Sequence, residues 1–142
     1  MRYILYASSA IVPFNPEQLD ELLRISRRNN ASVGVTGMLL YYDGNFIQYI
    51  EGGSEALDGL YDRIAADPRH RGLLVLDSGE ISDRILPEWS MGFEDVSPQD
   101  DEAIGAFALT AEALDGALDP ALPKTVIAMM RTFHRTMNLR NG

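Results

Sequence analysis

The chain has 142 residues, of which 46% are apolar, and its 21 acidic and 12 basic side chains give a net charge of −9. This length suffices for one sizeable core and is too short for two ordinary domains. The negative charge disfavours binding to nucleic acid, and the lack of cysteine excludes a disulfide, a thiolate metal site and a cysteine nucleophile. Because no segment has the length and apolarity of a membrane span and no secretory signal is present, we expect a soluble, cytoplasmic protein.

The N-terminal part of the chain has the pattern of a strand followed by a helix. Residues 2–8 are rich in aromatic and β-branched types, which favour a strand. Asn15 at the cap, Pro16 at the first helical position and Gln18 three residues past the cap predict where the helix begins. Leucines at helical spacing place one side of this helix against a core, and the polar stretch 27–30 is expected to close it.

The next part predicts a hairpin and a second helix. Apolar segments 33–42 and 46–51 are separated by Asp43-Gly44, a strong hairpin signal. Ser54 is expected to cap a second helix, which Pro68 ends because the residue before a proline is a poor helical residue. Four apolar residues line one side of this helix: Leu57, Leu60, Tyr61 and Ile64.

Two further strands, 72–77 and 88–93, complete the order β-α-β-β-α-β-β. Two helices among mostly antiparallel strands predict an α+β sandwich of the split-βαβ type, with both helices on one face of the sheet. Beyond residue 97 two more helices are predicted, near 100–114 and 122–137. The apolar side of the second must pack on the open sheet face or against a partner; it contains Ile127, Met130, Phe133 and Met137.

The chain lacks the common catalytic and metal-binding motifs. His70 and His134 are its only histidines and do not have the spacing of a metal pair, so no metal site is predicted. There is no glycine-rich phosphate loop and no nucleophile elbow. Glu51 follows an apolar run, but the end of a strand is an ordinary place for an exposed glutamate. These absences favour a protein that is not an enzyme.

Three polar residues on different segments are of more interest. Tyr6 belongs to the first strand, Asn30 to the end of the first helix and Gln48 to the third strand. Singly, each has an ordinary explanation, since a lone glutamine in a strand is usually exposed. Gln48, however, shares a strand face with Phe46 and Ile50, which favours burial, and a buried amide needs hydrogen-bond partners.

Seven stretches carry a wider resemblance: LYASS at 5–9, RNN at 28–30, GVTGMLL at 34–40, FIQYIEG at 46–52, LYDRI at 60–64, DPRH at 67–70 and WSMGF at 89–93. In this order and spacing, residues 2–95 resemble the BLUF domains, which are blue-light sensors that use a flavin. The resemblance implies a ferredoxin-like sheet with the flavin ring between its two helices. It also implies a sensor domain at 1–96 and a C-terminal helical extension at 97–142.

The resemblance implies roles for the polar residues. Tyr6 matches the tyrosine that gives an electron and a proton to the excited flavin, and Gln48 matches the glutamine that bridges this tyrosine and the N5/O4 edge of the flavin. Asn30 matches the asparagine bonded to the carbonyl and imide side of the ring, with Asn29 adjacent. An amide suits a switch because it carries both donors and an acceptor, so rotation or tautomerisation reverses what it offers.

Further positions follow from the same resemblance. Trp89 and Met91 match the last-strand residues near the glutamine and are expected to read out its state. Apolar walls above and below the ring are assigned to Leu22, Phe46 and Ile64, which are equally compatible with an ordinary core. Positions around the far edge of the ring and the ribityl or phosphate chain are assigned to Arg63, Asp67, Arg69 and His70.

The implied function is that of a photoreceptor with FAD as cofactor, although FMN or riboflavin would fill the same site. With no recognisable effector domain in the sequence, the signal is expected to pass through the last strand and the C-terminal helices to a partner protein or a homo-oligomer. Two alternatives stay open: a light-independent interaction scaffold, and a small acyl-phosphate hydrolase on the same fold.

Overall fold

The computed structural model describes residues 1–12, 16–42, 44–85 and 120–141, and the elements below are given within these ranges. In chain order they are β1 (Arg2–Ala10), α1 (Pro16–Val33), β2 (Thr36–Tyr42), β3 (Asn45–Gly52), α2 (Ser54–Ala66), β4 (His70–Glu80) and α4 (Lys124–Asn141). The predicted strand at 88–93 and the predicted helix at 100–114 lie outside the described residues.

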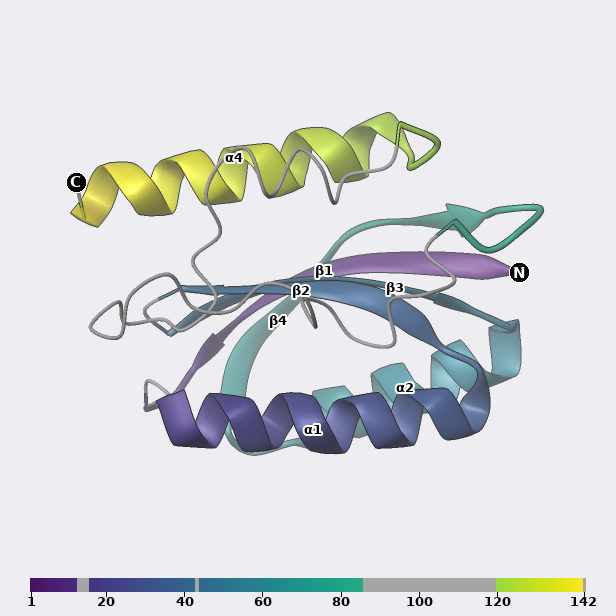
Figure 1. The fold of residues 1–142 in the computed structure, drawn as a ribbon, viewed down its shortest axis with the longest axis horizontal. Helices are drawn as coiled ribbons and strands as arrows, with labels where there is room; N and C mark the ends of the chain where they lie inside the picture. The colour runs from purple at the N-terminus through teal and green to yellow at the C-terminus, as the bar shows by residue number, and fades with distance from the viewer. Residues whose placement is uncertain (13–15, 43, 86–119, 142) are drawn as a thin grey trace.

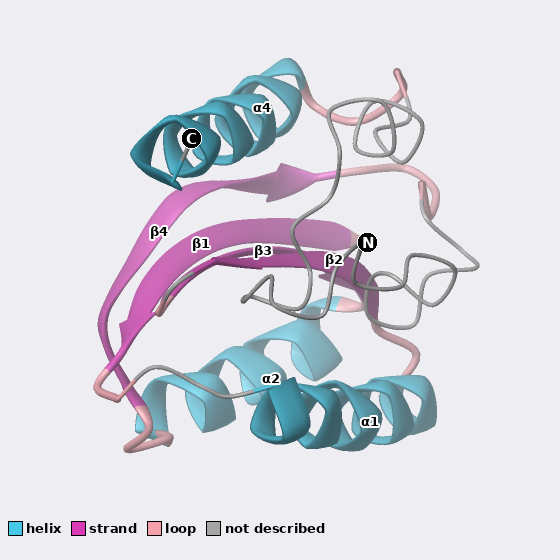
Figure 2. Cartoon of the chain, turned by 60° about the vertical axis from the view of Figure 1, so that its left-hand side comes forward, coloured by secondary structure: helices cyan, strands magenta, loops and turns pink. Residues whose placement is uncertain are grey.

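The described strands form one antiparallel sheet in the order β2-β3-β1-β4. Helices α1 and α2 cover one face of this sheet, and α4 lies across the other (Figures 1 and 2). The predicted ferredoxin-like α+β fold, with two helices on one face, is therefore confirmed. None of the helices in the described ranges combines the length and the apolar character needed to cross a membrane.

Each face of the sheet has its own apolar core because side chains alternate along every strand. On the α2 side, the buried residues are Ile4, Tyr6, Val35, Ile50, Leu57 and Leu60. On the α4 side, buried residues of the sheet pack with those of the C-terminal segment, among them Tyr3, Leu5, Met38, Leu40, Ile47, Tyr49, Leu122, Val126 and Met130. The open sheet face considered from the sequence is thus covered by α4 of the same chain.

The ends of α1 and α2 differ from the predicted ends. Helix α1 continues to Val33 instead of closing at 27–30, because polar residues do not by themselves stop a helix. It ends at Gly34, whose φ of 71° suits a residue without a Cβ. Ser54 is the first residue of α2 and not its cap; Gly53 holds the cap position, with no side-chain hydrogen bond.

The other end of α2 and the packing of α4 agree with expectation. Helix α2 ends at Ala66, and Asp67, which precedes a proline, has extended backbone angles. Met130 of α4 is fully buried, while Ile127 and Phe133 are partly buried against the same core. The side chain of Met137 lies outside the described structure.

Candidate functional site

The pairing of β1 with β3 brings two predicted site residues together. Tyr6 lies directly opposite Gln48 in the β1–β3 register, and Gln48 is in turn opposite Leu39 of β2. Opposed residues of an antiparallel pair have Cβ atoms about 5 Å apart and point to the same face. Tyr6 is only 4% exposed and Gln48 only 5%. The alternative of a solvent-facing Gln48 is therefore wrong.

Helix α2 supplies the surroundings of the Tyr6 ring. Tyr6 packs in the cluster that contains Leu57 and Leu60, and the edge of its ring meets Tyr61 at a centroid distance of 6.2 Å and an angle of 85°. Ile64, a predicted wall of the flavin site, is partly buried against this cluster. Burial raises the pKa of Tyr6 above its usual value, and Tyr61 adds to the shift. The phenol thus keeps its proton at neutral pH.

The pairing of β1 with β4 is irregular on both sides of Tyr6. Irregular pairing occurs between Leu5 and Tyr6 and again between Ala7 and Ser9. Such bulges increase local twist and re-aim side chains, and they are frequent beside functional sites. Tyr6 therefore has regular pairing toward Gln48 on one side and irregular pairing toward β4 on the other.

Aromatic and small residues extend the same face toward the other end of β3. Phe46, a second predicted wall, is buried and packs against Tyr41, with ring centroids 4.6 Å apart. Ser8 lies opposite Phe46 in the register and is 7% exposed. No role for Ser8 followed from the sequence; its place two residues after Tyr6 in a strand, and hence on the same face, was the signal available.

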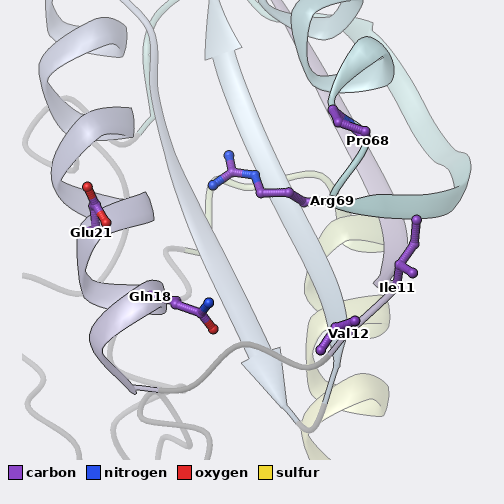
Figure 3. A pocket seen from close by; sticks show the side chains of 6 residues that line it. All are labelled: Ile11, Val12, Gln18, Glu21, Pro68 and Arg69. Atoms are coloured by element: carbon purple, nitrogen blue, oxygen red, sulfur yellow. The ribbon is translucent and has the colours of Figure 1, made fainter.

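A cavity of about 370 Å³ opens between the start of α1, the end of β1 and the connection from α2 to β4. Figure 3 shows the six side chains that line it: Ile11, Val12, Gln18, Glu21, Pro68 and Arg69. This volume lies in the range of small-molecule sites. Of these residues, only Arg69 was assigned to the site from the sequence. Ile11, Val12, Gln18 and Glu21 come from segments that meet Arg69 only in the folded chain.

Arg69 is held in place by Asp67, another predicted site residue. Its Nε lies 3.0 Å from Asp67 Oδ1 and its Nη2 lies 2.7 Å from Oδ2, a two-pronged ion pair. The hydrogen bonds that Arg69 donates to this carboxylate raise the pKa of Arg69 above its usual value, against the effect of burial. The guanidinium is thus a fixed positive group at the cavity.

The remaining predicted residues are placed less completely. Asn29 on α1 and Arg63 on α2 are exposed. The backbone positions of Leu22 and Asn30 lie within α1 and that of His70 begins β4, but their side chains are outside the described structure. Trp89 and Met91 also lie outside the described residues, so their roles stay predictions. Nowhere in the described ranges do three His, Asp or Glu side chains gather as metal ligands would.

The expectation for Glu51 is wrong. Its side chain is completely buried, on the sheet face opposite to that of Gln48. This burial could not be predicted, because a glutamate after an apolar run is compatible with an exposed and with a buried side chain. Its burial depends on polar partners from other segments, among them the Thr36 hydroxyl at 3.1 Å.

A ferredoxin-like sandwich that pairs a buried tyrosine with a buried glutamine, and that also has a cavity at Arg69, has the features of a flavin-binding light-sensor domain. The family model of BLUF domains, described as sensors of blue-light using FAD, matches residues 1–92. The chain therefore belongs to the BLUF family, as its seven sequence stretches had indicated, and blue-light sensing through a flavin is the function of that family.

The chain is similar to much larger proteins over 64% of its length. It is 39% identical over 93 residues to the photoactivated adenylate cyclase subunit beta of Euglena longa, a match that covers 64% of this chain and 11% of that protein. The same identity is found with subunit alpha of Euglena gracilis, over 64% of this chain and 9% of the relative. The chain thus spans a small part of the curated relatives it matches.

Solved structures also resemble nearly the whole chain, BlrB and BlrP1 among them. BlrB, a BLUF protein in its dark state, is 32% identical with a TM-score of 0.67, over 95% of this chain and 96% of that chain. BlrP1 of Klebsiella pneumoniae, in a complex with manganese and cyclic diGMP, is 25% identical with a TM-score of 0.75, over 94% of this chain and 32% of that chain.

Proposed function

We propose that Tyr6 and Gln48 form the light-responsive pair of this blue-light sensor, Tyr6 as electron and proton donor and Gln48 as hydrogen-bond switch. The observation that carries the proposal is their direct opposition in the β1–β3 register, with both side chains buried on the face that α1 and α2 cover. Burial strengthens the few hydrogen bonds within such a network and penalises any that is left unmade.

The chemistry divides between the cofactor and the chain. Bound flavin supplies the absorption of blue light and, when excited, a strong acceptor for an electron. Tyr6 would give both the electron and its Oη proton to the excited flavin, because loss of an electron makes a phenol strongly acidic. In the resting protein the raised pKa of Tyr6 keeps that proton in place. The Gln48 amide then exchanges the group it offers, donor for acceptor, without a large movement of the chain.

The residues around Tyr6 and Gln48 and, separately, the cavity at Arg69 have the chemistry to hold a flavin. The buried amide and phenol offer polar contacts on the face that carries α1 and α2, while Phe46 and Ile64 offer apolar surface. We assign the isoalloxazine ring to this region, with Leu22, Asn29, Asn30 and Arg63 as further contacts. Arg69 at the cavity, held by Asp67, and the neighbouring His70 suit the ribityl and phosphate part of the cofactor.

We infer FAD as the cofactor, since the family description names FAD. FMN remains the second candidate, because one structure of BlrP1 contains FMN. Extraction of the pigment from the purified protein followed by chromatography decides between them. A removable pigment that is neither nucleotide would assign riboflavin.

We propose that the chain senses light without catalysing a reaction, and that its output is association with a partner protein or with a second copy. The domain boundary near residue 96 belongs to this proposal, with the C-terminal extension as the output element. Leu74 and Val75 support association, since they are 59% and 44% exposed on β4, at the edge of the described sheet. Light scattering in darkness and under blue light tests the homo-oligomer.

The test of the photochemical proposal is the visible spectrum in darkness, directly after blue light and during recovery. The wild type should show a flavin spectrum that shifts slightly to the red and returns. Gln48→Leu and Tyr6→Phe should still bind flavin and lose the shift. Tyr61→Phe is the matched control, because it keeps the ring against Tyr6 and should retain the shift. A normal shift in Gln48→Leu would remove the switch assignment.

A further inference from the structure

The buried carboxylate of Glu51 is satisfied by donors from three segments. Its Oε1 accepts from the Tyr49 hydroxyl at 2.8 Å, and its Oε2 accepts from the Thr36 hydroxyl at 3.1 Å. The backbone N–H of Ile85 donates to both oxygens, at 3.1 and 2.9 Å. Because a buried carboxylate is costly unless such donors surround it, the three segments are tied to one another through this side chain.

The contacts around Glu51 form part of a row of hydrogen-bonded and stacked side chains that reaches across the whole described sheet. Glu51 of β3 lies opposite Thr36 of β2 on one side and Tyr3 of β1 on the other. The Tyr3 ring stacks on Tyr49, with centroids 5.8 Å apart, and its hydroxyl donates to Asp77 of β4 at 2.7 Å. Side-chain hydrogen bonds and one aromatic stack therefore connect all four described strands on the face that α4 covers.

The same row ends where the chain leaves β4. Ile85 is five residues past the end of β4, and its side chain is partly buried against the core that includes Val126 and Met130 of α4. The guanidinium of the preceding Arg84 donates to the Thr36 hydroxyl at 3.2 Å. Glu51 thus fixes the connection after β4 to β3, beneath the C-terminal helix.

Packing alone does not call for a carboxylate at this position. Apart from Thr36, the nearby buried positions on this face, such as Tyr3, Ile47 and Tyr49, are aromatic or aliphatic. An apolar side chain avoids the desolvation cost that a buried charge brings. What the carboxylate adds is an acceptor for the Ile85 N–H. Gln48 lies three residues earlier in β3, with its side chain on the other face, so one strand carries both groups.

We propose that Glu51 is a positioning residue that couples the Gln48 side of β3 to the chain after β4 and to the face under α4. A change in the hydrogen bonds of Gln48 alters the pairing of β3, and the Glu51 carboxylate passes that change to the Ile85 N–H. The link between Glu51 and the Ile85 N–H in darkness is supported by the hydrogen bonds alone. Its light dependence rests on the proposed function of Tyr6 and Gln48.

The test is residue-resolved hydrogen exchange of the Ile85 amide, in darkness and under blue light, on wild type and Glu51→Gln. In darkness the variant should exchange this amide about tenfold faster, as expected for a weakened bond to a charged acceptor. The variant should keep the red shift of the flavin, because Glu51 lies on the far face. Illumination should change the exchange of Ile85 in the wild type and not in the variant.

A matched control removes the same charge without touching the row. Glu80→Gln neutralises an exposed carboxylate of β4 and should leave both the dark rate and the light response of Ile85 unchanged. If Glu51→Gln does not fold, Thr36→Val serves instead, because it removes one hydroxyl from the carboxylate while keeping the side-chain shape. It should change the Ile85 exchange in the same direction by a smaller factor.

The outcomes separate this inference from the proposed function. Equal dark exchange of Ile85 in wild type and Glu51→Gln would overturn the positioning role, whatever the spectra show. A normal red shift in the wild type with no light-induced change at Ile85 would overturn the coupling and leave the photoreceptor function standing. A wild type without any red shift would overturn the proposed function, while the dark comparison would still decide whether Glu51 positions Ile85.

Discussion

Replacement of Gly37 by alanine should weaken the fold at the strand that carries Gln48. A Cβ at this position would lie 2.1 Å from the carbonyl oxygen of Tyr49 and 3.0 Å from the Cα of Ile50. Both neighbours are main-chain atoms of β3, which is paired with β1 and β2 on its two sides, so they cannot rotate away as a flexible side chain would. One of the two strands has to move by roughly 1 Å to relieve the contact.

The size of the effect follows from this displacement. Overpacking of a close-packed interior costs about 1–3 kcal/mol, and a contact with main chain belongs at the upper end, so we expect a loss of about 3 kcal/mol in the free energy of unfolding. With a urea dependence of about 2 kcal/mol/M, the midpoint of urea unfolding should fall by about 1.5 M. Because Tyr49 and Ile50 directly follow Gln48, the variant should also show a smaller light-induced red shift.

Gly59→Ala is the matched control for this substitution. Gly59 lies within α2, and a Cβ there would meet no atom within 4 Å. Alanine restricts the unfolded chain and favours the helix, so this variant should gain about 0.5–1 kcal/mol. A Gly37→Ala protein whose urea midpoint equals that of the wild type would refute the steric argument, and so would two variants that change stability in the same direction.

Two further predictions concern buried tyrosines and the C-terminal helix. Burial raises the pKa of Tyr3 to about 12 and also raises those of Tyr6 and Tyr49 above the usual value of 10. Above pH 10 these tyrosines lose their protons in the unfolded chain before they lose them in the folded chain. The urea midpoint should therefore be steady below pH 10 and fall as the pH rises toward 12. A midpoint that rises in this range would contradict the burial of these phenols. Met130→Ala should lower the free energy of unfolding by about 2–5 kcal/mol, because Met130 is fully buried. Met129→Ala, the control at a 37% exposed position, should change the free energy of unfolding little in the same urea titration. Equal effects of the two substitutions would show that α4 does not pack as described.

The order and type of the elements were predictable because they depend on local patterns. The apolar segment 46–51, the Asp43-Gly44 pair and the proline at 68 are patterns within a few residues of chain, and the strands, the hairpin and the helix end follow from such patterns. The exact ends of the helices were harder to predict from local patterns. Helix α1 runs past the polar stretch 27–30 to Val33 and stops before Gly34, because polar residues do not by themselves stop a helix.

The site was predictable only in part, and for a different reason. Tyr6 and Gln48 were singled out through the family resemblance, and strand periodicity favoured the burial of Gln48, but their direct opposition depends on the register between two strands that are far apart in sequence. The cavity at Arg69 likewise combines α1, the end of β1 and the α2–β4 connection. Neither the opposition of Tyr6 and Gln48 nor the cavity at Arg69 can be predicted from a single segment of the sequence.

Glu51 shows most clearly where sequence and tertiary structure divide. The sequence by itself determined that an apolar strand ends in a carboxylate, that two helices cover one face of a sheet, and that the chain has the residues of a BLUF sensor. Only the folded chain decided that this carboxylate is buried and meets Tyr49, Thr36 and the Ile85 N–H. The physical reason is that periodicity and propensity act locally, whereas the burial of a charge depends on donors that distant segments bring to it.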